Sequence, residues 1–282
     1  MTVKTIAVLG AGTMGHGIAH AAAAAGYDTR LYDVSDAQLA KARGAVEGIL
    51  RKTVELGKGT AADADRTLAR LTTTNDLTTA LGGVDVVIEA APERVAIKLS
   101  LMAEIDRLAP AEAVIATNTS ALSITEIAGV LARPSRVAGM HFFNPVHKMK
   151  LIEIVRALES SPETLETIES VARSMGKETV LVREAPGFIT TRVNASIGNE
   201  AFYMLMEGVA SARDIDKALK LGLNHPMGPF ELVDLVGLDT RLSILEYLHR
   251  SMGEKYRPCP LLAQYVKAGR LGKKVGKGVY EY

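Results

Sequence analysis

Hydrophobic and polar residues follow one pattern over the first two-thirds of the chain and another over the last third. Short apolar runs rich in β-branched residues, such as Ile6–Leu9 and Val84–Ile88, are typical of strands buried on both faces of a parallel sheet. Because helix-length segments alternate with these runs, the pattern predicts right-handed crossovers and a mainly parallel sheet. Strands are predicted at Ile6–Leu9, Thr29–Tyr32, Val84–Ile88, Val114–Ala116, Val137–Met140, Leu151–Val155 and Thr179–Val182, and helices at Met14–Ala25, Asp36–Leu56, Ile97–Leu108 and Pro162–Met175.

The strand pattern ends at Pro186-Gly187. Beyond it, Ile189, Val193 and Ile197 recur at every fourth position and predict a helix with one apolar face. Further helices are predicted at Ala212–Leu221, Pro229–Val236, Thr240–Met252 and Pro260–Ala268. We therefore expect an α/β fold in two domains. Residues 1–185 would form a Rossmann-type doubly wound sheet, and residues 186–282 an all-helical domain.

Composition narrows the class of protein without naming its function. The 282 residues carry 33 Lys and Arg against 32 Asp and Glu, and this balance argues against a nucleic-acid binder. The single cysteine, Cys259, excludes a disulfide framework. No apolar run approaches the ~18 residues of a membrane helix, and a strand-like run begins almost at the N-terminus. We expect a cytoplasmic protein with no nucleic-acid or membrane partner.

A glycine-rich loop, Gly10-Ala-Gly-Thr-Met-Gly15, follows the first strand and opens the first helix. This context is typical of dinucleotide binding, because glycines let the backbone approach a pyrophosphate at a helix N-terminus. Asp33 lies eighteen residues after Gly15 and can accept hydrogen bonds from ribose hydroxyls, which favours NAD over NADP. The alternative is a structural turn with a solvated Asp33. The expected cofactor-binding residues here are Gly10, Gly12, Thr13, Met14, Gly15 and Asp33.

Two ionisable residues lie in the strands that follow. His141 comes at the end of the strand predicted at Val137–Met140, and Glu153 lies within the next strand. A lone carboxylate in an apolar strand needs a partner, because burying an unpaired charge is costly. If Glu153 holds one ring nitrogen of His141, the other nitrogen can act as a general base in alcohol oxidation. The alternative for His141 is a hydrogen-bonded core histidine.

Three small polar residues, Asn118-Thr-Ser120, follow the strand predicted at Val114–Ala116. At the carboxyl edge of a sheet, their side chains can reach a ligand carbonyl and a nicotinamide. They can equally serve as capping residues for a helix that begins near Ile124. Ser123 with Glu126 fits a capping box better, which leaves Ser120 for a ligand.

The chain shares a series of motifs, in the same order and over its whole length, with one known family. They include GAGTMG, IEAAPE, ATNTS, GMHFFNPV and NHPMGPFEL. The chain resembles the L-3-hydroxyacyl-CoA dehydrogenase family, and within it most of all the bacterial 3-hydroxybutyryl-CoA dehydrogenases. The resemblance implies reversible, NAD-dependent oxidation of an L-3-hydroxyacyl-CoA. It also implies a homodimer formed through the helical domain.

The resemblance assigns roles to individual residues. It implies that His141 is the catalytic base with Glu153 as its partner, and that Ser120 contacts the 3-oxygen of the substrate. Glu93 and Lys98 match positions near the nicotinamide ribose. Without the resemblance, they would be interpreted as ordinary charged residues at the start of a helix. Asn144 matches a position close to the active site.

One position departs from the family pattern. Many members carry Asn where this chain has Thr191, in Pro186-Gly-Phe-Ile-Thr-Thr-Arg192, and that Asn helps to hold the thioester end of the substrate. A threonine hydroxyl has a shorter reach. Asn194 lies about 60° away from Thr191 around a helix and can substitute in part. We expect both residues near the substrate.

A coenzyme A substrate needs cations for its phosphates. Lys52 on the predicted helix Asp36–Leu56 is the main candidate, with Arg51 nearby, although Glu47 and Glu55 interleave and also fit a solvated face. No metal is expected, because no third ligand accompanies the i, i+4 pair His16 and His20.

Two alternatives remain. The first is an NAD-dependent dehydrogenase of a hydroxy acid or sugar acid without coenzyme A, which would not need the cations of that helix. The second is a non-enzymatic protein that keeps the dinucleotide fold, and it predicts loss of His141 and Glu153, both of which are present.

Overall fold

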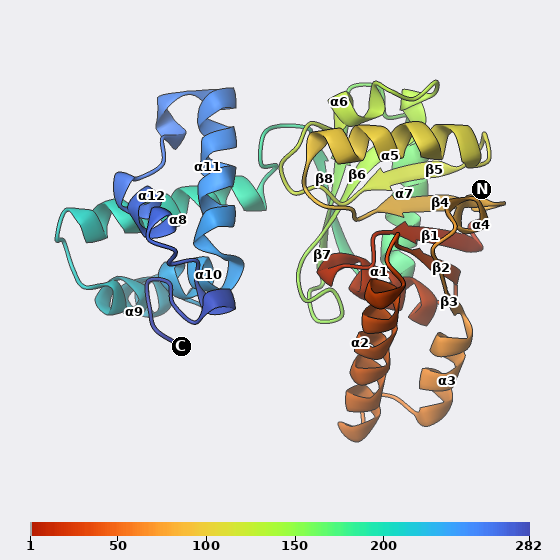
Figure 1. Cartoon of the computed structure of the whole chain (residues 1–282), viewed down its shortest axis with the longest axis horizontal. Coiled ribbons are helices and arrows are strands. Elements are labelled where there is room, and N and C mark those ends of the chain that lie inside the picture. Colours follow the sequence, from red (N-terminus) through yellow and green to blue (C-terminus); the bar gives the residue numbers. More distant parts are fainter. Residues whose placement is uncertain (1) are drawn as a thin grey trace. The chain divides into compact units, whose positions relative to one another are not determined.

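The computed structural model describes residues 2–282, and the chain divides into two compact units. One unit ends at Glu184 and the other begins at Ala185. Each unit has its own core and is described by itself (Figure 1). Within residues 2–282, no helix combines the length and the apolar character needed to cross a membrane.

The first unit is built on one eight-stranded sheet in the order β3-β2-β1-β4-β5-β6-β7-β8. The strand order reverses between β1 and β4, which is where ligands bind in doubly wound sheets. Every neighbouring pair is parallel except β6 and β7. The strands are β1 (Thr5–Leu9), β2 (Asp28–Tyr32), β3 (Leu71–Thr74), β4 (Val86–Glu89), β5 (Val114–Thr117), β6 (Val137–Phe142), β7 (Leu151–Arg156) and β8 (Glu178–Arg183).

Helices cover both faces of this sheet (Figure 1). Apolar side chains of α1, α2 and α7 pack with alternate residues of the strands, such as Val8 and Ile88, in one core. The residues between them point to the other face, where α5 lies. The helices are α1 (Thr13–Ala24), α2 (Asp36–Glu55), α3 (Ala61–Ala69), α4 (Leu77–Leu81), α5 (Val95–Leu108), α6 (Ile124–Ala128) and α7 (Pro162–Ser174), with a 3-10 turn at Pro134–Arg136.

The sheet confirms the Rossmann-type expectation and adds elements that the pattern did not predict. The strand β3 has the sequence LTTT and buries only Leu71 fully, so it lacks the apolar run expected of a buried strand. The connection between β6 and β7 is too short for a crossover helix, so these two strands pair antiparallel. As predicted, Ser123 caps α6 by accepting the N–H of Glu126.

The second unit is helical, and all five of its α-helices contribute residues to its core, among them Phe202, Phe230 and Leu245. Its chain end returns to this core. The buried Asp234 carboxylate accepts the backbone N–H groups of Val279 and Tyr280 at 2.8 and 2.9 Å. The helices are α8 (Thr190–Met206), α9 (Ala212–Gly222), α10 (Pro229–Val236), α11 (Leu238–Met252) and α12 (Pro260–Lys267), with 3-10 turns at Glu254–Tyr256 and Lys273–Val275.

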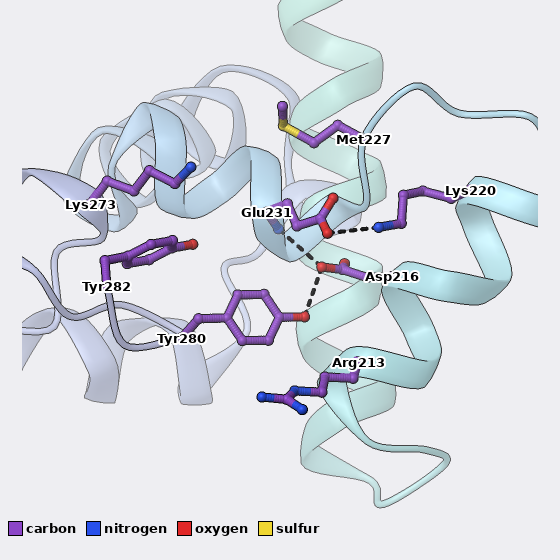
Figure 2. A pocket seen from close by; sticks show the side chains of 8 residues that line it. All are labelled: Arg213, Asp216, Lys220, Met227, Glu231, Lys273, Tyr280 and Tyr282. Atoms are coloured by element: carbon purple, nitrogen blue, oxygen red, sulfur yellow. Dashed lines mark hydrogen bonds and ion pairs between the residues drawn. The ribbon is translucent and has the colours of Figure 1, made fainter.

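A second buried aspartate holds the same tail. Asp216 of α9 accepts the Tyr280 hydroxyl at 2.7 Å and the first N–H groups of α10, while Lys220 pairs with Glu231 beside it (Figure 2). Burial of the hydroxyl is the main cause that raises the pKa of Tyr280, and the hydrogen bond to Asp216 is the second. The tail is therefore a packed clasp.

Candidate active site

The glycine-rich loop has the geometry of a pyrophosphate cradle. The helix α1 begins at Thr13 with Gly12 as its N-cap, and no side chain caps its first turn. A Cβ added at Gly15 would lie 1.6 Å from the Gly10 carbonyl oxygen, whereas a Cβ at Gly12 would meet nothing within 4 Å. The loop is thus tightly packed at Gly15 and open at Gly12. Its uncapped N–H groups fit the phosphates of a dinucleotide.

Asp33 lies directly after β2 and fixes this loop. Its Oδ2 accepts the N–H of Ala11 at 2.9 Å, and its Oδ1 accepts the N–H of Ser35 at 3.0 Å. These bonds hold the carboxylate beside the glycines, where a negative charge repels a 2′-phosphate. Contact between Asp33 and a ribose stays a prediction.

His141 and Glu153 form a direct pair, as the cost of a buried carboxylate predicted. The two residues lie opposite each other in the antiparallel register of β6 and β7. His141 Nδ1 lies 2.7 Å from Glu153 Oε2, His141 is buried and Glu153 is fully buried. Because the carboxylate accepts at Nδ1, this ring nitrogen carries the proton and Nε2 is the basic nitrogen. The strand β6 extends two residues beyond its predicted end at Met140, so His141 is its penultimate residue.

A row of buried polar groups crosses the same end of the sheet. Glu89 and Thr117 are the last residues of β4 and β5, they are paired in register, and both are fully buried. Thr117 donates to Glu89 Oε2 at 2.6 Å. By strand alternation, Glu89, Thr117, His141 and Glu153 all point to the face opposite the core of α1, α2 and α7.

Glu89 is a residue that the sequence analysis missed. The signal that identified Glu153, a lone carboxylate in an apolar strand, is equally present in Val86-Val-Ile-Glu89. Its partner is Lys98, one turn into α5, whose ammonium lies 2.7 Å from Oε1 and 2.9 Å from Oε2 of Glu89. Lys98 is only 1% exposed. Its ammonium is therefore engaged by Glu89 in this structure. Contact between Lys98 and a nicotinamide ribose stays a prediction.

The residues after β5 are held in place by Glu93 and by β6. Glu93 Oε1 accepts the Thr119 hydroxyl at 2.6 Å and the Ser120 N–H at 2.8 Å. Asn118 Oδ1 accepts the Phe142 N–H at 2.9 Å, next to His141. The structure thus brings Asn118 and Ser120 to the His141 end of the sheet, as expected.

The other predicted residues, Asn144, Lys52, Thr191 and Asn194, lie outside the two strands that carry His141 and Glu153. Asn144 is exposed on the loop after β6, and Lys52 is exposed near the end of α2. Thr191 and Asn194 lie in the first turns of α8, in the second unit. Their contacts with a cofactor or substrate stay predictions.

The second unit also contains a cavity of about 580 Å³, lined by residues of α9, α10 and the C-terminal tail (Figure 2). None of the residues predicted to bind the cofactor or to act on the substrate lines it. Within residues 2–282, no group of three or more His, Cys, Asp or Glu side chains is placed to hold a metal ion.

Comparison with known proteins agrees with this geometry over the whole chain. The sequence profile described as 3-hydroxyacyl-CoA dehydrogenase, NAD binding domain, matches residues 5–185, and the profile of the C-terminal domain of the same family matches residues 187–282. The chain is 47% identical over 283 residues to the probable 3-hydroxybutyryl-CoA dehydrogenase of Bacillus subtilis (strain 168), covering 100% of this chain and 98% of that protein.

Solved structures show the same relationship. The structure of (S)-3-hydroxybutyryl-CoA dehydrogenase from Ralstonia eutropha matches with a TM-score of 0.96 and 41% identity, covering 100% of this chain and 99% of that one. A diketoreductase described as acting on dicarbonyl compounds matches with a TM-score of 0.87 and 29% identity, covering 100% of both chains. The chain therefore belongs to the 3-hydroxyacyl-CoA dehydrogenase family, and it is an NAD-dependent oxidoreductase whose first unit is the NAD-binding domain of that family.

Proposed function

We propose that the chain catalyses reversible oxidation of L-3-hydroxyacyl-CoA to 3-oxoacyl-CoA, with 3-hydroxybutyryl-CoA as its substrate. The observation that carries this proposal is the buried His141–Glu153 pair, with 2.7 Å between Nδ1 and Oε2, at the carboxyl end of the sheet. The identity with proteins named as 3-hydroxybutyryl-CoA dehydrogenases supports the substrate.

The pair supplies the acid–base chemistry. His141 Nε2 takes the hydroxyl proton of the alcohol, and Glu153 stabilises the imidazolium that results through Nδ1. NAD, which the glycine-rich loop and Asp33 would hold, would supply the hydride acceptor for the carbon that bears this hydroxyl. Because Glu153 is fully buried, its charge is poorly screened and acts strongly on the ring. In the reverse direction, the protonated His141 returns the proton to the 3-oxygen.

Ser120 positions the oxygen that reacts. Its N–H is held by Glu93, which fixes the backbone and leaves the hydroxyl to donate to the 3-oxygen. Thr191 and Asn194 are proposed to hold the thioester end, and Lys52 to contact a coenzyme A phosphate. The exposure of Lys52 fits an anion arriving from solvent.

We also propose a cytoplasmic homodimer that assembles through the second unit. Large apolar side chains remain exposed there, including Leu221 at 77% and Leu223 at 65%. Exposed apolar surface of this kind favours association with a second copy. Sedimentation of the purified chain tests the dimer.

The substrate is tested by NADH oxidation with 3-oxoacyl-CoA of four to ten carbons, with free acetoacetate, and with NADPH in place of NADH. We expect the highest kcat/KM with acetoacetyl-CoA and NADH. Activity with the free acid alone would overturn the coenzyme A assignment.

A second candidate function is reduction of carbonyl compounds without coenzyme A. It is favoured by the structural similarity to the diketoreductase. In the same assay, this candidate predicts comparable kcat/KM for free dicarbonyl compounds and for acetoacetyl-CoA. It also predicts that Lys52→Ala leaves KM unchanged.

A further inference from the structure

We infer that Glu89 is a positioning residue for both ligands, because one buried carboxylate ties the cofactor loop, α5 and the Ser120 segment together. The inference rests on the proposed function only for the effect of Glu89 on acyl-CoA binding, and not for its effect on NADH binding. Glu89 is fully buried at the end of β4, beside the reversal of strand order between β1 and β4. Both of its carboxylate oxygens are used by groups from three different segments.

The first connection runs to the cofactor loop. Glu89 Oε1 accepts the N–H of Ala91 at 2.7 Å, which fixes the backbone directly after β4. That backbone packs against the glycine-rich loop, since a Cβ at Gly10 would lie 2.6 Å from the Ala90 carbonyl oxygen. A shift of Ala90 and Ala91 would therefore move Gly10, the first glycine of the cradle.

The second connection runs through Lys98 to Glu93. The Lys98 ammonium bonds to both oxygens of Glu89 and lies 3.5 Å from Glu93 Oε2. Glu93, which is 43% exposed, is thus held at one oxygen by a buried cation. Its other oxygen accepts the Ser120 N–H and the Thr119 hydroxyl. Lys98 can hold Glu93 in this orientation because Glu89 balances its charge.

The third connection runs along β5. Thr117 donates its hydroxyl proton to Glu89 Oε2, and the same oxygen of Thr117 accepts the N–H of Thr119 at 3.3 Å. The chain after Thr117 therefore leaves the sheet in a fixed direction. The Ser120 segment is held from two sides, and both supports lead back to Glu89.

Replacing Glu89 by Gln keeps the size of the side chain and removes its charge. Lys98 then has Glu93 as its nearest anion, and this attraction draws Glu93 away from Ser120. We expect the KM for acetoacetyl-CoA to rise about tenfold or more, because the Ser120 hydroxyl loses its fixed position. We expect the Kd of NADH to rise about threefold through Ala91 and Gly10.

The experiment measures the Kd and stoichiometry of NADH by fluorescence, then kcat and KM for acetoacetyl-CoA per NADH-binding site. Counting sites removes any contribution from unfolded protein. The matched control is Asp85→Asn. Asp85 directly precedes the first residue of β4, at the end of the strand away from Glu89, and accepts the N–H groups of Lys4 and Thr5 at 2.7 and 2.9 Å. Asp85→Asn should lower Tm and leave both constants within twofold of the wild type.

Two less disruptive substitutions at Thr117 test the inference if the Glu89→Gln variant does not fold. Thr117→Val removes only the hydroxyl bonded to Glu89 and should raise KM about threefold, while Thr117→Ser keeps the hydroxyl and should restore it. If Glu89→Gln and Thr117→Val lower Tm but leave KM and the NADH Kd at wild-type values, Glu89 is only structural and the inference is wrong. If the wild type does not act on acetoacetyl-CoA, the proposed function fails, and the NADH Kd values still decide the role of Glu89.

Discussion

The two units bury their charged side chains in different ways. In the first unit, Glu89 pairs with Lys98 and Glu153 pairs with His141, at the carboxyl end of the sheet. In the second unit, Asp216 and Asp234 are satisfied by backbone N–H groups and tyrosine hydroxyls of the chain's own segments. We infer that pairing with a cationic or titratable side chain marks the buried charges that serve chemistry. Pairing with only backbone N–H groups and tyrosine hydroxyls marks the buried charges that hold the fold.

The largest effect should follow from removing the base. We expect His141→Asn to lower kcat by about 10²–10⁴-fold, because no other group would take the hydroxyl proton. The Kd of NADH, measured by fluorescence, should stay within twofold of the wild type. His225→Asn in the second unit is the matched control and should leave kcat unchanged. A His141→Asn variant with nearly full kcat would remove the distinction between the two units.

The aspartates of the second unit should show the opposite behaviour. Asp234→Asn introduces an amide that cannot accept all the bonds from Val279, Tyr280 and Tyr282, so the tail is released. We expect a loss of about 2–3 kcal/mol in the free energy of unfolding by urea. The Kd of NADH should not change, because the NAD-binding domain is the first unit. A weaker NADH affinity with normal stability would contradict the structural role.

A half-buried histidine, His20, extends the comparison of ionisable side chains within the first unit. Burial lowers the pKa of His20 from 6.5 to about 4, and its Nδ1 has no hydrogen-bond partner within residues 2–282. Because the unfolded chain binds the proton more readily, stability is complete above pH 6.5 and falls by about 3 kcal/mol as the pH drops towards 4.

The measurement for His20 is urea unfolding at pH 7, 6 and 5. His20→Gln should flatten the acid loss of stability, whereas His225→Gln should not. Equal slopes for the wild type and His20→Gln would show that His20 does not titrate in this way.

The second unit also buries an arginine with one unsatisfied hydrogen-bond donor. Arg241 of α11 is 1% exposed, burial lowers its pKa to about 10, and its Nε has no hydrogen-bond partner in the described part of the chain. Removing a buried charge relieves the cost of its desolvation, and here it also removes the unsatisfied donor. We expect Arg241→Met to raise the free energy of unfolding by about 1–3 kcal/mol. Arg250→Met, exposed on the same helix, is the control with no change, and a destabilised Arg241→Met would contradict the argument.

The sequence predicted those features of the fold that depend on local pattern or on the cost of burial. The glycine loop, the alternation of strands and helices and the His141–Glu153 pair follow from spacing and from the need to neutralise Glu153. The strand β3 was missed because its polar LTTT run buries little, and its pairing with β2 is a tertiary effect. Lys98 was placed only by resemblance, because its partner Glu89 lies on a strand nine residues earlier, and spacing alone does not show which side chains meet.

The central claim is that His141 and Glu153 act as one unit, and a double-mutant cycle on kcat for acetoacetyl-CoA reduction tests it most directly. The four proteins are the wild type, His141→Asn, Glu153→Gln and the double variant, each compared at saturating NADH. We predict that Glu153→Gln alone lowers kcat about tenfold to hundredfold, and that the double variant stays within about threefold of His141→Asn, because Glu153 acts only through the imidazole. Losses that multiply in the double variant would show that the two residues act independently, and would contradict the account.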